Sequence, residues 1–264
     1  MPTEKHQVSE MCSTAMEAAR QAGQTIASHY LTDHEITFKG YRDIVTEADI
    51  AAEEIVLGMI RDRFPHHAIL SEEAGETNGD EIHNDYMWIV DPLDGTSNYA
   101  HRIPLFSVSI GVVDAGGPLL GVVYDPLRDQ MFVAQRDKGA WINSRPMGVS
   151  PVARLVHAVV GLDWARDDTV RRAVLMRLLR LAPRVGTVRL LGSAALGLAY
   201  VAAGWLDAYF HPALGPWDVA AGTLLVTESG GRCTTMDGAP YHIRLNDCLA
   251  TNGSLHKALL ALIR

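Results

Sequence analysis

The chain has 264 residues, of which 48% are hydrophobic and 20% are charged, and a formal net charge of −8 at pH 7. This composition is typical of a globular protein with one large core or two smaller ones, and its acidity argues against a nucleic-acid-binding protein. The three cysteines form no C-x-x-C pair and no apolar run reaches 18 residues, so a disulfide framework, a zinc site and a membrane span are not expected.

The first half of the chain predicts two helices followed by a sheet. Small and apolar residues recur at helical spacing over residues 8–30, and residues 43–65 predict a second long helix that ends at Pro65, after a polar stretch. A short strand then runs into acids, residues 75–85 predict a polar loop, and Tyr86–Val90 predict a buried strand. A hairpin around Gly116 and Gly117 and two further strands extend the sheet, over residues 106–114, 118–126, 130–135 and 139–147.

The character of the chain changes near residues 145–151. Beyond this point strands alternate with helices, which predicts a three-layer second domain. We therefore expect an α+β protein with an N-terminal domain over residues 1–146 and a C-terminal domain over residues 147–264. The expected strands lie at 157–163, 187–192, 207–212 and 248–251, and the expected helices at 168–182, 193–203, 218–229 and 254–263.

The stretch WIVDPLDGTSNYAHRIP, residues 88–104, carries the most specific chemical signal. Asp91 and Asp94 follow an apolar strand, so both carboxylates and the Leu93 carbonyl can face one point. Hard oxygen ligands of this kind suit Mg²⁺, and the N–H groups of Gly95 and Thr96 can bind an anion if a helix begins there. The alternative is an acidic turn in which Asp94 caps a helix.

Three further acidic segments can be read in two ways each. Glu72, in SEEAG (71–75), is a third candidate carboxylate or part of a surface pair with Glu73. Asp218, in PWDVAAG (216–222), is a metal ligand or a helix N-cap. Asp49, in DIVTEAD (43–49), is a base or belongs to the first turn of an exposed helix.

Taken in this order, the four segments resemble the inositol monophosphatase family over roughly residues 10–262. The resemblance implies a layered αβαβα sandwich of the inositol monophosphatase and fructose-1,6-bisphosphatase type. It also implies two or three Mg²⁺ ions per site. Glu72, Asp91 and the Leu93 carbonyl would hold the first ion, and Asp91, Asp94 and Asp218 the second, with a weaker third ion near Glu72.

The same resemblance implies roles for the neighbouring residues. Thr96 and Asp49 would activate the attacking water, with Glu72 as the third member of the catalytic set, and Gly95 and Thr96 would bind the phosphate. Lys39 and Asp43 match a mobile loop that closes near the metals, and Glu73 matches a residue that supports the metal ligands from outside. The substrate side would be lined by Asp94, Gly192, Ser193, Ala194, His211 and Asp218.

One departure from the family pattern concerns specificity. Inositol-specific members carry an acidic residue six positions before the tryptophan of the last motif, where this chain has His211. Histidinol phosphate, sugar phosphates and fructose 1,6-bisphosphate therefore remain alternatives to inositol phosphate. His211 can equally be a strand-end histidine at a subunit interface.

The expected function is that of a Mg²⁺-dependent, lithium-sensitive phosphomonoesterase acting on inositol 1-phosphate or a related small polyol or sugar phosphate. The alternatives are a histidinol-phosphate or fructose-1,6-bisphosphate phosphatase with the same site, and, in another class, an interaction protein of a transcription complex. We expect a small phosphorylated substrate, a homodimer, and no membrane or nucleic-acid partner. A cytoplasmic location is expected because the first residues contain no apolar signal segment.

Overall fold

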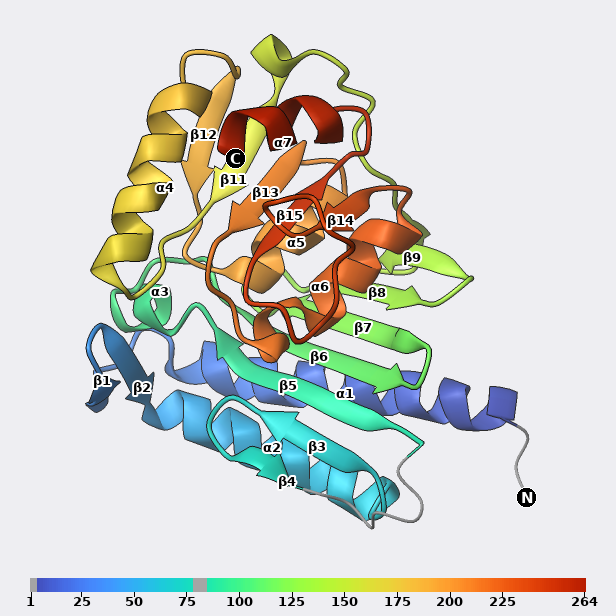
Figure 1. Cartoon of the computed structure of the whole chain (residues 1–264). Helices are drawn as coiled ribbons and strands as arrows, with labels where there is room; N and C mark the ends of the chain where they lie inside the picture. Colours follow the sequence, from blue (N-terminus) through green and yellow to red (C-terminus); the bar gives the residue numbers. More distant parts are fainter. Residues whose placement is uncertain (1–3, 78–84) are drawn as a thin grey trace.

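A computed structural model of the chain describes residues 4–77 and 85–264 (Figure 1). The helices are α1 (Glu4–His29), α2 (Glu47–Arg63), α3 (Thr96–Ala100), α4 (Asp168–Leu181), α5 (Ala194–Ala202), α6 (Pro216–Glu228) and α7 (His256–Ile263), with a 3₁₀ turn, η1, at Leu155–His157. The strands of the first half are β1 (Ile36–Gly40), β2 (Asp43–Thr46), β3 (Ala68–Ser71), β4 (Gly75–Thr77), β5 (Met87–Asp94), β6 (Ser107–Asp114), β7 (Gly117–Asp125), β8 (Gln130–Gln135), β9 (Gly139–Ile142) and β10 (Arg145–Pro146). Those of the second half are β11 (Val159–Leu162), β12 (Thr187–Leu190), β13 (Ala208–His211), β14 (Arg232–Thr234) and β15 (Cys248–Thr251).

These elements stack in five layers, as Figure 1 shows. Helices α1 and α2 cover one face of an eight-stranded sheet with the order β10-β9-β8-β7-β6-β5-β3-β4. Helices α5 and α6 lie between this sheet and a five-stranded sheet, β12-β11-β13-β15-β14, whose far side carries α4 and α7. The predicted αβαβα sandwich is therefore confirmed.

Helix α1 buries the side chains that its sequence period predicts. Its apolar stripe packs into the core between α2 and the large sheet, and the residues that carry the predicted period have no exposed surface: Met11, Ala15, Ala18, Ala22 and Ile26. Their spacing of three and four residues places them on one helix face, so burial of this stripe fixes α1 against the sheet.

The predicted helix over residues 43–65 is wrong at its start. Residues 43–46 instead form β2, which pairs antiparallel with β1 in a hairpin, and α2 begins at Glu47. The Asp49 carboxylate accepts hydrogen bonds from the backbone N–H and the hydroxyl of Thr46, at 2.8 and 2.6 Å. This capping box satisfies the N–H and hydroxyl of Thr46, the residue just before the first helical turn, and it fixes the N-terminal end of α2 at Glu47.

Helix α6 packs against β6 and β7 through glycines. A Cβ atom on Gly111 would lie 2.6 Å from Ala220 Cβ, and one on Gly121 would lie 2.6 Å from the Ala221 carbonyl oxygen. Only glycine therefore allows this approach. The close packing brings the first turn of α6, with Asp218, over the carboxyl end of β5.

Two further short strands were missed by the sequence analysis, and one predicted loop needs correction. Strands β4 and β14 were not expected from the sequence, since each has only three residues at a sheet edge. The loop predicted over residues 75–85 begins with β4, and residues 78–84 lie outside the described residues.

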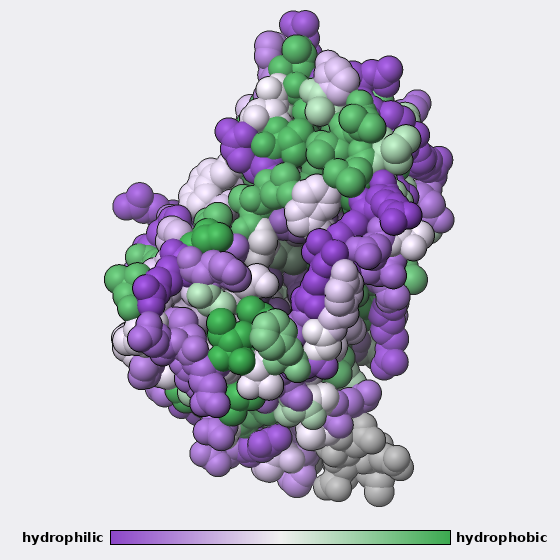
Figure 2. Space-filling view, turned by 90° about the vertical axis from the view of Figure 1, so that its left-hand side faces the viewer, coloured by the Kyte–Doolittle hydropathy of each residue, from purple (hydrophilic) through white to green (hydrophobic). Residues whose placement is uncertain are grey.

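Helix α4 leaves apolar side chains exposed. Leu175, Met176 and Leu179 are exposed by 46%, 61% and 69%. Figure 2 shows hydrophobic side chains gathered on the upper part of the face that carries α4. No helix within the described ranges is long and apolar enough to cross a membrane.

Candidate metal centre

Asp91 and Asp94 stand together because β5 is irregular at its end. Asp91 pairs with Ser109 of β6 and Asp94 with Ser107, so two residues of β5 face one of β6 between them. Such a bulge redirects side chains that regular alternation would send to different faces. Both aspartates are nearly fully buried, and Asp91 Oδ1 accepts the Leu93 N–H at 3.1 Å.

Asp218 completes a cluster of three carboxylates. It lies in the first turn of α6, where Oδ2 accepts the Gly215 N–H at 2.6 Å. Asp91, Asp94 and Asp218 each offer one oxygen atom, and these atoms lie within 4.8 Å of one another. The N-cap of α6 is Gly215 and not Asp218, which bonds the Gly215 backbone from the first turn and has its other carboxylate oxygen left for the cluster.

Glu72 lies beside this cluster on the neighbouring strand. Strands β3 and β5 are parallel, with Ser71 opposite Val90, and the Glu72 N–H donates to the Val90 carbonyl at 3.1 Å. The Glu72 carboxylate lies 3.6 Å from Lys39 Nζ and 3.7 Å from Arg166 Nη2. The two cations offset part of its charge.

The acids raise one another's pKa values. Burial, and then the charge of Glu72, raises the pKa of Asp91 and of Asp218 well above the usual range. Burial also raises the pKa of Glu72 to about 7, against the opposing effect of Lys39. Carboxylates this close repel one another by roughly 4 kcal/mol per pair at an effective dielectric near 20. Oxygen ligands under such repulsion fit a hard divalent cation, which relieves it.

Asp94 accepts hydrogen bonds from the start of α5. The Ala194 N–H donates to Oδ1 at 3.0 Å and the Ala195 N–H to Oδ2 at 3.2 Å. The hydroxyls of Ser193 and Ser107 also donate to Oδ2, the latter at 3.1 Å. Burial raises the pKa of Asp94, and these donors oppose the rise by stabilising the charged form.

Thr96 and Asp49 meet at the edge of the cluster. Thr96 Oγ1 lies 2.9 Å from Asp49 Oδ1 and 3.0 Å from the Leu93 carbonyl oxygen. Asp49 is buried rather than in the exposed first turn that was the sequence alternative, and burial raises its pKa to about 6. Gly95, just before α3, has φ +94°, and a Cβ there would crowd the Leu105 and Gly192 carbonyls at 3.0 and 3.1 Å. Glycine is therefore required at this turn.

His211, at the end of β13, is buried and held by backbone groups. Its Nδ1 accepts the Ala213 N–H at 3.1 Å, and the ring also bonds the backbone of Trp164. Burial lowers the pKa of His211 to about 4, so the ring is neutral near pH 7. The ring is therefore held by backbone groups on two sides.

The β1–β2 hairpin reaches over the acids. Lys39 Nζ lies 2.5 Å from Glu73 Oε1 and 3.9 Å from Asp43 Oδ1. Among the described residues Asp43 Oδ1 has no hydrogen-bond partner, although it is buried. Arg166 Nη1 lies 2.8 Å from Asp43 Oδ2, and sequence reasoning missed this arginine because no motif contains it.

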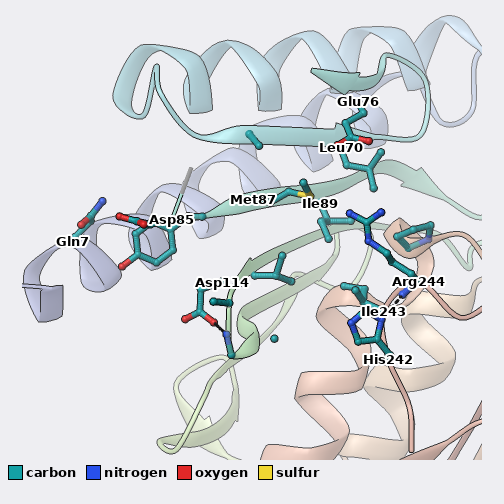
Figure 3. A pocket seen from close by; sticks show the side chains of 17 residues that line it. Gln7, Leu70, Glu76, Asp85, Met87, Ile89, Asp114, His242, Ile243 and Arg244 are labelled. Carbon is teal, nitrogen blue, oxygen red and sulfur yellow. Dashed lines mark hydrogen bonds between the residues drawn. The ribbon is translucent and has the colours of Figure 1, made fainter. Parts of the chain in front are cut away.

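A cavity of about 860 Å³ lies elsewhere (Figure 3). It is bounded by Leu70, Met87 and Ile89 of the sheet and by His242 and Arg244 across from them. None of the acids discussed above lines it. The carboxylate cluster is therefore the stronger candidate site, since its side chains converge and the cavity's charged groups do not.

Comparison with known proteins agrees with this geometry. The sequence pattern described as "Inositol monophosphatase family" matches residues 7–264. "Nus factor SuhB" of Escherichia coli (strain K12) is 38% identical over 257 residues, and "Inositol monophosphatase 3" of Solanum lycopersicum is 37% identical over 257, each match covering 96% of both chains. The crystal structure of extragenic suppressor protein suhB from Bartonella henselae superposes with a TM-score of 0.92 at 34% identity, covering 97% of this chain and 98% of that one.

Proposed function

Because the chain belongs to the inositol monophosphatase family, we propose that it is a Mg²⁺-dependent phosphomonoesterase of small polyol or sugar phosphates such as inositol 1-phosphate. The convergence of Asp91, Asp94 and Asp218 carries this proposal. Glu72, Asp91 and the Leu93 carbonyl would hold one ion, Asp91, Asp94 and Asp218 another, and Glu72 a weaker third. Bound Mg²⁺ supplies an acidified water and stabilises the departing alkoxide.

In this proposal Thr96 and Asp49 orient the attacking water. The Thr96 hydroxyl donates to Asp49 Oδ1, 2.9 Å away, so its oxygen can accept a hydrogen bond from the water; as the water attacks, its proton passes to Thr96 and the Thr96 proton passes to Asp49. Asp49 is held in place by Thr46, which makes the pair rigid. Phosphoryl transfer depends mainly on such positioning and on charge neutralisation.

The remaining residues divide between the phosphate and the alcohol. The N–H groups of Gly95 and Thr96 receive the phosphate at the start of α3. Lys39 and Asp43 close the site from the β1–β2 hairpin, with Glu73 as the partner of Lys39. The alcohol side is formed by Asp94, Gly192, Ser193, Ala194, His211 and Asp218.

A role in a transcription complex is the second candidate. Relatives called Nus factors are as similar to the chain as relatives called inositol monophosphatases, at 38% and 37% identity. The presence of each proposed ligand supports the enzyme, because an interaction role requires none of them. A homodimer and a cytoplasmic location belong to the same proposal, and size-exclusion chromatography with light scattering tests the former.

A phosphate-release screen tests the activity. Purified protein with Mg²⁺ is given inositol 1-phosphate, histidinol phosphate, fructose 1,6-bisphosphate, adenosine 2′-monophosphate and 3′-phosphoadenosine 5′-phosphate. We expect release from at least one small polyol or sugar phosphate, abolished by EDTA and by Asp91→Asn. Absence of release from all five would favour the interaction role.

A further inference from the structure

Arg166 stands at the mouth of the carboxylate cluster. It lies in the loop between β11 and α4, with Nη1 2.8 Å from Asp43 Oδ2 and Nη2 3.7 Å from Glu72 Oε1. Its side chain is 57% exposed, and its backbone carbonyl accepts a hydrogen bond from Arg42 Nη1 at 3.2 Å. The guanidinium therefore faces the acids from the solvent side.

Arg166 lies on the alcohol side of the proposed site. Burial raises the pKa of Glu72 and of Asp218, and the charge of Arg166 opposes both shifts. Burial also lowers the pKa of His211, and the charge of Arg166 adds to that effect. Strands β11 and β13 are parallel, with Leu162 opposite Phe210, so the loop that carries Arg166 leaves the sheet beside His211, where the proposed function has the leaving alcohol.

His211 holds the loop that carries this arginine. Its Nδ1 accepts the Ala213 N–H, and its ring also bonds the backbone of Trp164, two residues before Arg166. The neutral ring contributes no charge of its own. The positive charge on the alcohol side is therefore that of Arg166, and His211 holds the loop that carries it.

The carboxylates of Asp43 and Glu72 both lie near the Arg166 guanidinium, but most of its N–H donors remain available. Asp43 also faces Lys39 at 3.9 Å, and Glu72 faces Lys39 at 3.6 Å and belongs to the proposed ion ligands. A guanidinium has five N–H donors in a planar fork that matches phosphate and carboxylate oxygens. The contact with Asp43 uses Nη1 alone.

We propose that Arg166 is a specificity-determining residue that binds a second anionic group, phosphate or carboxylate, on the alcohol part of the substrate, with His211 as its positioning residue. The inference rests on the proposed phosphatase function and narrows its substrate class. Esters that carry a second anion are preferred over esters of neutral polyols.

The first test compares fructose 1,6-bisphosphate with fructose 1-phosphate, which share the scissile group. We expect kcat/KM of the wild type to be at least about tenfold higher for the bisphosphate than for the monophosphate. One charge-assisted hydrogen bond to the second phosphate is strong enough to give a difference of about this size. Arg166→Gln should lower the ratio of the two kcat/KM values, bisphosphate over monophosphate, to about one. Arg172→Gln, an equal charge change on the exposed side of α4, should keep it.

The second test measures binding without turnover. In a Thr96→Ala background with Mg²⁺, calorimetry should show tighter binding of the bisphosphate, and the added Arg166→Gln should remove the difference. If Arg166→Gln weakened the binding of both esters equally, Arg166 would contact the scissile phosphate, and the proposal would be overturned. Absence of any preference in wild type would also overturn it.

The third test addresses His211. His211→Gln can still accept from Ala213 and donate to Trp164, so it should retain the bisphosphate preference, whereas His211→Leu should lose it and keep the Mg²⁺-induced rise in Tm. A preference unchanged in His211→Leu would remove the positioning role. Failure of the phosphatase proposal is distinct, since then neither ester would be hydrolysed.

Discussion

Thr96 Oγ1 lies 2.9 Å from Asp49 Oδ1 although the two residues are 47 positions apart, and this contact joins the start of α3 to the first turn of α2. It places a hydroxyl and a buried carboxylate beside the cluster formed by Asp91, Asp94 and Asp218. A nucleophilic side chain is unnecessary in such a site, because positioned water and charge neutralisation can carry phosphoryl transfer.

The hydroxyl of Thr96 is the first target for mutation. Thr96→Val removes it with little change in shape and should lower kcat by about 10²–10⁴-fold, the usual contribution of a positioned proton acceptor. Thr96→Ser keeps the hydroxyl and should retain most of the rate. Steady-state kinetics measures kcat of both variants and of wild type. A Thr96→Val variant with full activity would exclude Thr96 from the water-activating pair.

The metal ligands are tested by neutral isosteres. Asp91→Asn and Asp218→Asn should each reduce Mg²⁺-dependent hydrolysis by at least about a thousandfold, since a metal contributes several kcal/mol. Mg²⁺ should raise the Tm of wild type by linkage, and both variants should lose much of that rise. Asp33→Asn, at an exposed carboxylate, is the matched control. Undiminished activity in a variant would remove that residue from the site.

The pKa of Glu72 gives a stability test in EDTA. Burial raises this pKa from 4.5 to about 7, so the folded state favours the protonated form, and the charged form costs stability as pH rises through this interval. Glu72→Gln should therefore stabilise the metal-free protein by about 1–3 kcal/mol at pH 8 and by little at pH 4.5. Denaturant unfolding at both pH values measures this difference. Equal effects at the two values would contradict it.

Lithium provides a pharmacological test that follows from the family resemblance. Li⁺ should inhibit uncompetitively at millimolar order by occupying the second ion position after the alcohol leaves. Initial rates at several substrate concentrations reveal the pattern. Activity indifferent to Li⁺ at tens of millimolar would place the chain in an insensitive branch of the superfamily.

Gly121 tests how the fold positions Asp218. A Cβ there would lie 2.6 Å from the Ala221 carbonyl oxygen, so Gly121→Ala should push α6 from the sheet and destabilise the protein by about 1–3 kcal/mol. It should also reduce the Mg²⁺-induced rise in Tm. Gly58→Ala, in α2 with nothing within 4 Å of the new Cβ, should instead be neutral or stabilising. Equal Tm values for the two variants would refute this account.

Much of the fold was predictable because it depends on short-range patterns. The period of α1, the buried run of β5 and the glycine turn before β7 each indicate their own conformation, and the structure has them where expected. The hairpin of β1 and β2 was not predictable. Its exposed residues show no alternation of burial, and the residues of β2 continue into a helical pattern.

The candidate acids were likewise identifiable, since residue type and order suggest oxygen ligands. Their convergence required tertiary structure: parallel pairing puts Glu72 beside β5, and Gly111 and Gly121 let α6 bring Asp218 to Asp91. The contact of Arg166 with Asp43 and the bond of the His211 ring to the Trp164 backbone also depend on chain segments distant in sequence. Local sequence determines which groups can bind a cation or an anion, whereas their distances and protonation depend on burial and charges that only packing brings together.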